Sequence, residues 1–267
     1  MKVEPKAAAF FDLDRTIIAG SSVFVFGWVA YRRGFVPTPQ LIKDAANAVA
    51  FKFAGASDDK TETVKKRILE AIEGVEVGVL TDLADEIIPK LLHDVRREAR
   101  GLIDLHDDAG RDTYIVSASP VEIVGRFADE MGMTGGIGTV SEIVDGTYTG
   151  NLAEPFCYGE GKADAIRRMA ARQGYDLARS YAYTDSAGDL PMLDVVGHPV
   201  AVNPDRELEA IAMHRGWPVV EFSRTRKKVI KRTTALSGAA LAAATAYGLG
   251  RRHGRLAAPR RFLRVGR

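Results

Sequence analysis

Two carboxylates two residues apart, followed by a hydroxyl, are the groups best placed to do chemistry in this chain. Asp12, Asp14 and Thr16 end the segment Ala-Ala-Ala-Phe-Phe-Asp-Leu-Asp-Arg-Thr, residues 7–16. A short, continuous apolar run is typical of a buried parallel strand, and ligands of open α/β sheets bind beyond the carboxyl ends of such strands. Strand alternation would point both carboxylates to one side, where they can hold Mg²⁺ and one can attack a phosphorus atom. The competing interpretation is a solvated strand end, because Asp is common in turns.

Three further motifs stand where the sequence predicts a strand end or a helix start. Ser117 lies between a strand and a helix, where its hydroxyl and the free backbone amides can receive a phosphate. Lys162 begins a helix after a glycine-rich turn, and Asp185 and Asp189 follow another apolar strand. Each motif alone is also explained as an ordinary N-cap or surface residue. All of them together, in this order, indicate one site.

The elements that must position these motifs fall into two regions. Strand and helix signals alternate from residue 112 to 222, with a hairpin expected around Asp145-Gly146. This alternation predicts an α/β fold with a doubly wound, mostly parallel sheet. The second region, residues 21–100, follows the first motif; it shows helical spacing and needs no strand. The helices expected in it are Val23–Arg33, Pro39–Phe53, Lys60–Ile72 and Leu80–Arg100.

Charge is divided unevenly along the 267 residues, although the net charge is only +2. From Arg224 onward there are 13 Lys and Arg and no Asp or Glu, whereas the preceding chain has 24 basic and 35 acidic residues, a net charge of −11. A basic tail of this kind favours an anionic surface. Within it, Thr233–Gly250 is uncharged and just long enough to reach the lower limit for a membrane-spanning helix, but its alanines supply little insertion energy. The alternative is a partly disordered helix.

The compartment and the partners follow from a few further observations. Cys157 is the only cysteine, so an intrachain disulfide is excluded, and no signal peptide is recognised at the N-terminus. We therefore expect a cytoplasmic protein, with residues 224–267 as a possible contact with an anionic membrane. We expect no nucleic-acid partner, because the tail lacks interleaved aromatic residues for base stacking.

The four motifs together resemble those of the haloacid dehalogenase superfamily of phosphatases, in the branch that includes phosphoserine phosphatase. The similarity runs from about Lys6 to Phe222. It is carried by the DxDxT motif and by the SASP, YGExK and DLPML segments at Asp12–Thr16, Ser117–Pro120, Tyr158–Lys162 and Asp189–Leu193. The resemblance implies a Rossmann-like core, residues 1–20 and 101–222, an inserted all-helical cap, residues 21–100, and a separate tail, residues 223–267.

The resemblance also implies roles for the acidic residues. Asp12 would be the nucleophile that forms an aspartyl-phosphate, and Asp14 would protonate the leaving alcohol and then activate water. Asp12, the backbone carbonyl of Asp14 and Asp185 would bind Mg²⁺.

The remaining motif residues would bind or orient the phosphoryl group. Thr16, Ser117 and Lys162 would hold its oxygens, and Asp189 would hold a metal-bound water or orient Lys162. The expected function is Mg²⁺-dependent hydrolysis of a small phosphomonoester, with a lipid phosphate among the candidates.

The choice of substrate stays open because the sequence departs from amino-acid-selective members. Those members place a Glu shortly after the first motif, but here the segment reads Gly-Ser-Ser at residues 20–22, with no acidic residue between Asp14 and Asp44. In the fourth motif, Gly188 also stands where members of this family commonly have an Asn. Phosphoserine hydrolysis, phosphoryl transfer to another alcohol and a non-catalytic regulatory protein of the same fold are the alternatives.

Overall fold

A computed structural model describes residues 6–34, 65–66, 69–70 and 72–222 of the chain. Within them, six parallel strands form one sheet in the order β3-β2-β1-β6-β7-β8. The strands are β1 (Ala8–Asp12), β2 (Asp112–Pro120), β3 (Gly135–Thr139), β6 (Tyr181–Thr184), β7 (His198–Val202) and β8 (Val219–Val220). The order reverses at β1, which places the first motif at the point where ligands bind in such sheets.

Alternating side chains of the strands divide the hydrophobic core between the two faces of the sheet. Phe11 and Ile115 belong to one cluster, and Phe10 and Val116 belong to the other. The helices of the first face are α5 (Arg97–Asp108) and α6 (Val121–Glu130). The second face packs against α7 (Glu160–Gln173), α8 (Leu190–Asp194) and α9 (Arg206–Arg215). The expected doubly wound parallel sheet is confirmed.

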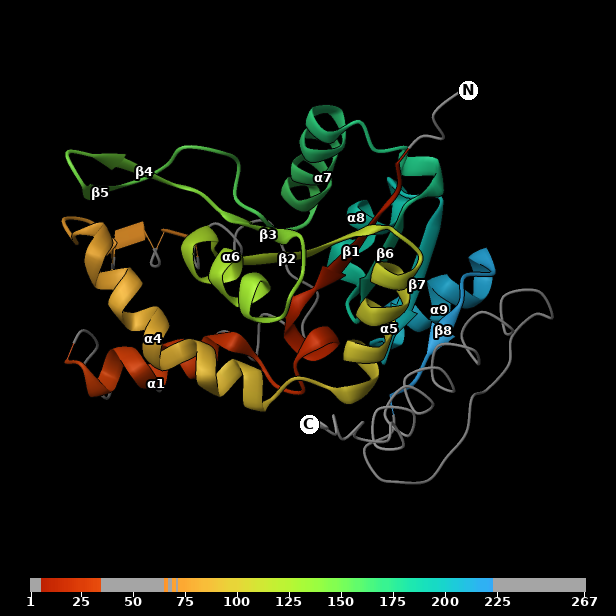
Figure 1. The fold of residues 1–267 in the computed structure, drawn as a ribbon, viewed down its shortest axis with the longest axis horizontal. Coiled ribbons are helices and arrows are strands. Elements are labelled where there is room, and N and C mark those ends of the chain that lie inside the picture. Colours follow the sequence, from red (N-terminus) through yellow and green to blue (C-terminus); the bar gives the residue numbers. More distant parts are fainter. Residues whose placement is uncertain (1–5, 35–64, 67–68, 71, 223–267) are drawn as a thin grey trace, which may run out of the picture.

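Two helices of the inserted region are described, α1 (Ser22–Arg32) and α4 (Val77–His93). In Figure 1 they lie side by side at one end of the molecule, away from α9 and β8. Helix α4 buries Leu80, Ala84, Ile87, Ile88 and Leu91, the spacing of an amphipathic helix that packs against a core. The expected helix Pro39–Phe53 lies outside the described residues, as does most of Lys60–Ile72. The division into core, cap and tail stays a prediction.

The expected continuous helix Leu80–Arg100 is wrong, because α4 ends at His93 and α5 begins at Arg97. The residues between them pair with the segment that follows the first motif. The amide of Ala19 donates to the carbonyl of Asp94 at 2.9 Å, and the amide of Arg96 donates to the carbonyl of Ile17 at 2.9 Å. These backbone bonds replace the helical ones, so the chain segments that enter and leave the inserted region lie side by side.

The hairpin is confirmed, and it consists of β4 (Ser141–Val144) and β5 (Thr147–Leu152) around Asp145-Gly146. It lies against the segment before α4, where Glu76 pairs with Thr147. Tyr148 is buried there and donates to Glu122 on α6 at 3.0 Å. The hairpin thus connects the inserted region to the core.

Strand β3 was not anticipated, because three of its five residues are glycine. Glycine weakens a strand and hides it from pattern analysis. Here close packing requires it: a Cβ atom on Gly136 would lie 2.6 Å from the amide nitrogen of Gly125 on α6. A side chain at this position would push α6 off the sheet.

Candidate active site

Asp12, at the carboxyl end of β1, forms a buried ion pair with Lys162 of α7. The ammonium of Lys162 donates to Oδ1 of Asp12 at 2.6 Å and to Oδ2 of Asp189 at 2.9 Å. The side chains of Lys162 and Asp12 are only 4% and 10% exposed. Thr184, the last residue of β6, donates its hydroxyl to the same oxygen of Asp189 at 2.7 Å. The structure therefore brings Asp12 and Asp189 together on the ammonium group of Lys162.

Lys162 keeps its positive charge in this buried position. Burial lowers the pKa of its ammonium, but the attraction of Asp12 and Asp189 outweighs burial and leaves the pKa above the ordinary value of 10.5. Removing one partner from such a buried pair is strongly destabilising, since it leaves an uncompensated charge. Lys162 is accordingly a fixed cation beside the carboxylate of Asp12.

The glycine-rich turn before Lys162 allows this close approach. Gly161 lies so near the carbonyl of Phe156 that an added Cβ would sit 1.8 Å from its oxygen. Gly159 has a φ of 53°, in the region that favours glycine. The turn can therefore tighten enough to bury the start of α7, and Lys162 with it, against the strand ends.

Asp14 is held by the first turn of α1 instead of by the strand. The strand ends at Asp12, and Asp14 lies in the irregular π-type turn η1 (Leu13–Ile17), so strand alternation does not orient it as expected. Its Oδ1 accepts from the amide of Ser22 at 2.7 Å, and its Oδ2 accepts from the hydroxyl of Ser21 at 3.1 Å. The inserted region thus fixes the second carboxylate of the motif.

Arg15 and Asp185 form an ion pair that the sequence analysis did not anticipate. Nε of Arg15 lies 2.9 Å from Oδ2 of Asp185, whose side chain is 0% exposed. Arg15 has a φ of 62°, a left-handed conformation that its backbone keeps through a bond from its amide to the carbonyl of Gly20 at 3.0 Å. That conformation costs roughly 1–2 kcal/mol for a residue with a Cβ atom. Only its position inside the DxDxT motif could have drawn attention to Arg15.

The two hydroxyl residues expected to bind phosphate are both buried near these strand ends. The hydroxyl oxygen of Thr16 has no hydrogen-bond partner within the described part of the chain, which is unusual for a buried polar atom. Oγ of Ser117 accepts from the amide of Ser119 at 3.2 Å. Ser119 in turn lies 3.3 Å from the hydroxyl of Ser22, so the end of β2 also contacts the start of α1. Thr16 is thus positioned to accept a new partner such as a phosphoryl oxygen.

The chemistry of the donors fits Mg²⁺. Asp12 is the last residue of β1 and Asp185 directly follows β6, and in these two adjacent strands Phe11 is in register with Tyr183. Both offer hard carboxylate oxygens, as Mg²⁺ prefers, and the buried charge of Asp185 already attracts a cation in the form of Arg15. Among the residues described, no three or more His, Cys, Asp and Glu side chains form a metal-binding group. A Mg²⁺ site here would take a further protein oxygen from the backbone of Asp14.

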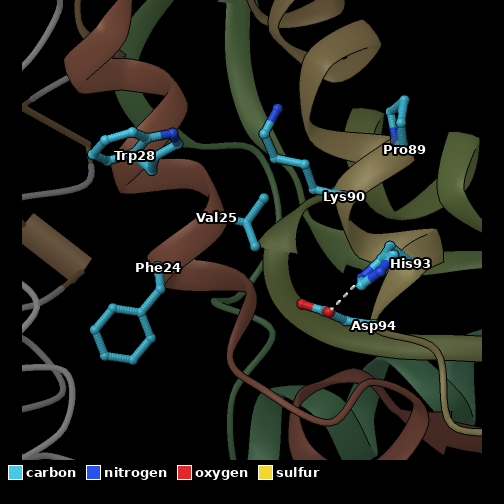
Figure 2. A pocket seen from close by; sticks show the side chains of 7 residues that line it. All are labelled: Phe24, Val25, Trp28, Pro89, Lys90, His93 and Asp94. Carbon is cyan, nitrogen blue, oxygen red and sulfur yellow. Dashed lines mark hydrogen bonds and ion pairs between the residues drawn. The ribbon is translucent and has the colours of Figure 1, made fainter.

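An open groove of about 460 Å³ lies between α1 and α4, and its lining on α1 begins at Phe24, just after the residues that hold Asp14. Figure 2 shows Trp28 and Phe24 on one wall and Lys90 and His93 on the other. Trp28 and Phe24 are 51% and 47% exposed. None of the expected catalytic or phosphate-binding residues lines this groove.

Comparison with known proteins confirms the family that the motifs resemble. The sequence profile of the haloacid dehalogenase-like hydrolases matches residues 9–194. A probable phosphatase of Mycobacterium tuberculosis strain H37Rv is 41% identical over 91% of this chain and 85% of its own length. The phosphoserine phosphatase SerB1 of the same strain is 37% identical over 84% of this chain and 74% of its own.

A solved structure supports the fold independently. A protein of unknown function from Bordetella pertussis Tohama I superposes with a TM-score of 0.71 at 26% identity, covering 81% of this chain and 98% of the other.

No helix within the described residues is long and apolar enough to cross a membrane. The basic tail lies outside those residues, so its expected membrane contact stays a prediction.

Proposed function

We propose a reaction for this chain from one premise: it belongs to the family of haloacid dehalogenase-like hydrolases and is a phosphatase. The proposed reaction is hydrolysis of a small alkyl phosphomonoester through a phosphoryl group carried on Asp12. The observation that carries the proposal is the buried contact of Asp12 with Lys162, 2.6 Å long, at the switch point of the sheet.

Asp12 is the proposed nucleophile because its surroundings keep it ionised and directed to the strand end. The ammonium of Lys162 favours the carboxylate form of Asp12 and offsets the charge of an arriving phosphate. In the first step an oxygen of Asp12 forms a bond to phosphorus as the bond from phosphorus to the alkoxide oxygen breaks. In the second step water attacks the same phosphorus, and Asp12 leaves as a carboxylate.

Asp14 is the proposed acid and base for these steps. It donates a proton to the departing alcohol and takes one from the attacking water. The bonds from Ser21 and Ser22 hold both of its oxygens, at 3.1 and 2.7 Å, so the carboxyl group reaches the reaction from a fixed direction. The geometry gives the two motif carboxylates different neighbours, and we assign them different tasks for that reason.

Mg²⁺ is the proposed cofactor, with Asp12, Asp185 and the backbone carbonyl of Asp14 as its protein ligands. When bound, such an ion neutralises charge on the phosphoryl oxygens. Thr16, Ser117 and Lys162 are proposed to bind the phosphoryl oxygens, which supplies the missing partner of the Thr16 hydroxyl. Asp189 is proposed to orient Lys162, whose ammonium it accepts at 2.9 Å.

The substrate class is proposed only as far as the residues near Asp14 allow. Ser21 and Ser22 both donate to the carboxylate of Asp14, and neither carries the negative charge that would select an ammonium group. Phosphoserine, suggested by the name of the SerB1 relative, is therefore one candidate. The others are phosphate esters of uncharged alcohols and of lipids. The 13 basic residues from Arg224 onward are the feature that favours a substrate at an anionic membrane.

A phosphate-release assay on the full chain tests the proposal. Phosphoserine, a simple alkyl phosphate, sugar phosphates, nucleotides and a short-chain lipid phosphate would each be offered with Mg²⁺ and with EDTA. We expect Mg²⁺-dependent release from at least one alkyl phosphate. Release that persists after exhaustive chelation would refute the metal site, and a folded protein with no release from any substrate would support the non-catalytic alternative. An alcohol acceptor added to an active reaction separates hydrolysis from phosphoryl transfer, because transfer would yield a new ester.

A further inference from the structure

We propose that Ser119, at the end of β2, is a positioning residue for Asp14, which it holds through Ser22 of α1. This inference rests on the proposed function, in which Asp14 is the acid and base. It deepens that function by naming a residue outside the inserted region on which the direction of the Asp14 carboxylate depends. Three contacts among the described residues carry the inference.

The first contact joins the core to the inserted region. Oγ of Ser119 lies 3.3 Å from Oγ of Ser22, and the two residues are 9% and 1% exposed. One hydroxyl donates to the other, and such a hydrogen bond is electrostatically stronger in a buried position than in water. The end of β2 therefore fixes the first residue of α1, which lies 97 residues earlier in the chain.

The second contact continues from Ser22 to the carboxylate. The amide of Ser22 donates to Oδ1 of Asp14 at 2.7 Å. Ser21 is the N-cap residue of α1 but makes no side-chain cap to the helix, and its hydroxyl donates to Oδ2 of Asp14. A carboxylate beside the first turn of a helix also interacts favourably with the helix dipole. The position of Asp14 therefore depends on where α1 begins, and the Ser119 hydroxyl helps to determine that place.

The third contact holds Ser119 itself. The pairing of β2 with β3 shifts register between Val116 and Pro120, an irregularity of the kind that re-aims side chains beside active sites. Gly138 of β3 packs so closely there that an added Cβ atom would lie 2.7 Å from the carbonyl oxygen of Ser119. Because its backbone packs against a neighbouring strand, Ser119 holds Ser22 from a fixed position.

Ser119 also contacts the proposed phosphate-binding group, but through its backbone. Its amide donates to Oγ of Ser117 at 3.2 Å, and a hydroxyl that accepts one hydrogen bond still has its own proton to donate. The amide of Ser119 therefore acts on the hydroxyl proposed to bind phosphate, whereas its side chain acts on the acid. Removing the side chain alone should disturb proton transfer to the leaving group and leave phosphate binding unchanged.

The experiment compares wild type with Ser119→Ala in the hydrolysis of an alkyl and an aryl phosphate. The matched control is Thr113→Val, which removes a buried hydroxyl at the opposite end of β2, where it donates to Asp107 at 3.1 Å. Ser119→Ala should lower kcat/KM for the alkyl phosphate about tenfold, a part of the roughly 10²–10⁴-fold contribution of general acid catalysis. The aryl phosphate and the inhibition constant for inorganic phosphate should hardly change. Thr113→Val should keep the alkyl-to-aryl ratio of wild type, because a loss of stability alone does not alter that ratio.

A double variant shows whether the loss passes through Ser22. Ser22→Ala removes the partner hydroxyl and keeps the backbone amide, so it should shift the alkyl-to-aryl ratio as Ser119→Ala does. The double variant should show no further shift, because both substitutions remove the same hydrogen bond. Losses that multiply in the double variant would contradict the path through Ser22.

Hydrogen exchange of the Ser22 amide, followed by NMR on the full chain, supplies a readout that needs no activity. Exchange should be faster in Ser119→Ala than in wild type, because the bond from this amide to Asp14 opens more often, and it should be unchanged in Thr113→Val. An unchanged exchange rate in Ser119→Ala, an unchanged alkyl-to-aryl ratio or equal losses on both esters would overturn the inference. Wild type that releases no phosphate from any ester would refute the proposed function, and the exchange rate would then decide whether Ser119 holds the contact of Ser22 with Asp14.

Discussion

Lys162 donates to Asp12 at 2.6 Å across 150 residues of sequence, and the contact is almost completely shielded from water. The pair joins the start of α7 to the end of β1, so a cation and the proposed nucleophile are fixed before any substrate arrives. Preorganised charge of this kind is usually the largest contribution to enzymatic rate enhancement. Asp14, by contrast, is held by α1, and the two carboxylates are therefore separable by mutation.

Asp14→Asn should slow the hydrolysis of an alkyl phosphate much more than that of an aryl phosphate. A poor leaving group needs a proton from Asp14, whereas an aryl oxide leaves with little help, and general acid catalysis typically contributes about 10²–10⁴-fold. The measurement is kcat/KM for both substrates in wild type, Asp14→Asn and Ser21→Ala. Ser21→Ala should show a smaller loss with the same preference, because it removes one bond to the carboxylate. Equal losses on both substrates in Asp14→Asn would argue against Asp14 as the acid.

Gly136→Ala should destabilise the fold by about 3 kcal/mol, the upper end of the usual cost of overpacking. The new methyl group would meet backbone atoms of α6 at 2.6 Å, and backbone cannot move aside as a side chain can. Gly78→Ala is the matched control, since no atom lies within 4 Å of an added Cβ in α4. That variant should gain up to about 1 kcal/mol from helix propensity. Urea unfolding of both variants tests the pair, and equal stabilities would show that α6 is not packed as described.

His106 should make the protein lose stability as the pH falls below neutrality. Burial, with a smaller contribution from Arg111, lowers its pKa from 6.5 to about 3. Nε of Arg111 donates to Nδ1 of His106 at 2.7 Å, so Nε2 carries the proton and donates to Tyr183 at 2.7 Å. Between these pH values the unfolded chain is protonated at this ring and the folded chain is not. The free energy of unfolding therefore falls by about 1.4 kcal/mol per pH unit within that window.

Urea unfolding of wild type and His106→Gln from pH 7 to pH 4 tests this titration. Glutamine retains a donor and an acceptor but does not titrate, so the variant should lose less stability than wild type as the pH is lowered. The difference in the free energy of unfolding between the two proteins should shrink steadily. Parallel curves would show that His106 does not titrate in this way.

The sequence predicted most of the sheet, and it placed most of the candidate site residues at strand ends or at a helix start, because both depend on local signals. Apolar runs locate the buried strands, and the polar residues that follow them must meet at one edge of a parallel sheet. The sequence did not reveal β3, whose glycines reflect contact with α6, a neighbour that only the folded chain supplies. It also did not reveal the pairing of Arg15 with Asp185 or the capture of Asp14 by α1. Those contacts depend on the irregular turn after Asp12, which no residue pattern specifies.

The basic tail should bring the protein to anionic membranes. Each Lys or Arg near such a surface contributes about 1 kcal/mol, and the contact weakens as salt is added. Flotation of the full chain, and of a chain ending at Phe222, with anionic and neutral vesicles measures this directly. The full chain should float with anionic vesicles but not with neutral ones, and it should float better at low salt than at high salt. The chain ending at Phe222 should not float with either kind of vesicle. Full-length protein that stays at the bottom in every case would exclude the membrane contact, and equal flotation of the shorter chain would place it outside the tail.

The central claim is that the phosphoryl group passes through Asp12, and rapid acid quenching followed by peptide mass spectrometry tests it most directly. Asp14→Asn mixed with an aryl phosphate should form the intermediate, because the leaving group needs no acid, and should hydrolyse it slowly, because the base is missing. We predict the added mass of one phosphoryl group on the peptide containing Asp12, and none when Asp12→Asn is added to the same variant. Phosphate release that continues in Asp12→Asn alone, with no phosphoryl group found on that peptide in Asp14→Asn, would contradict the account.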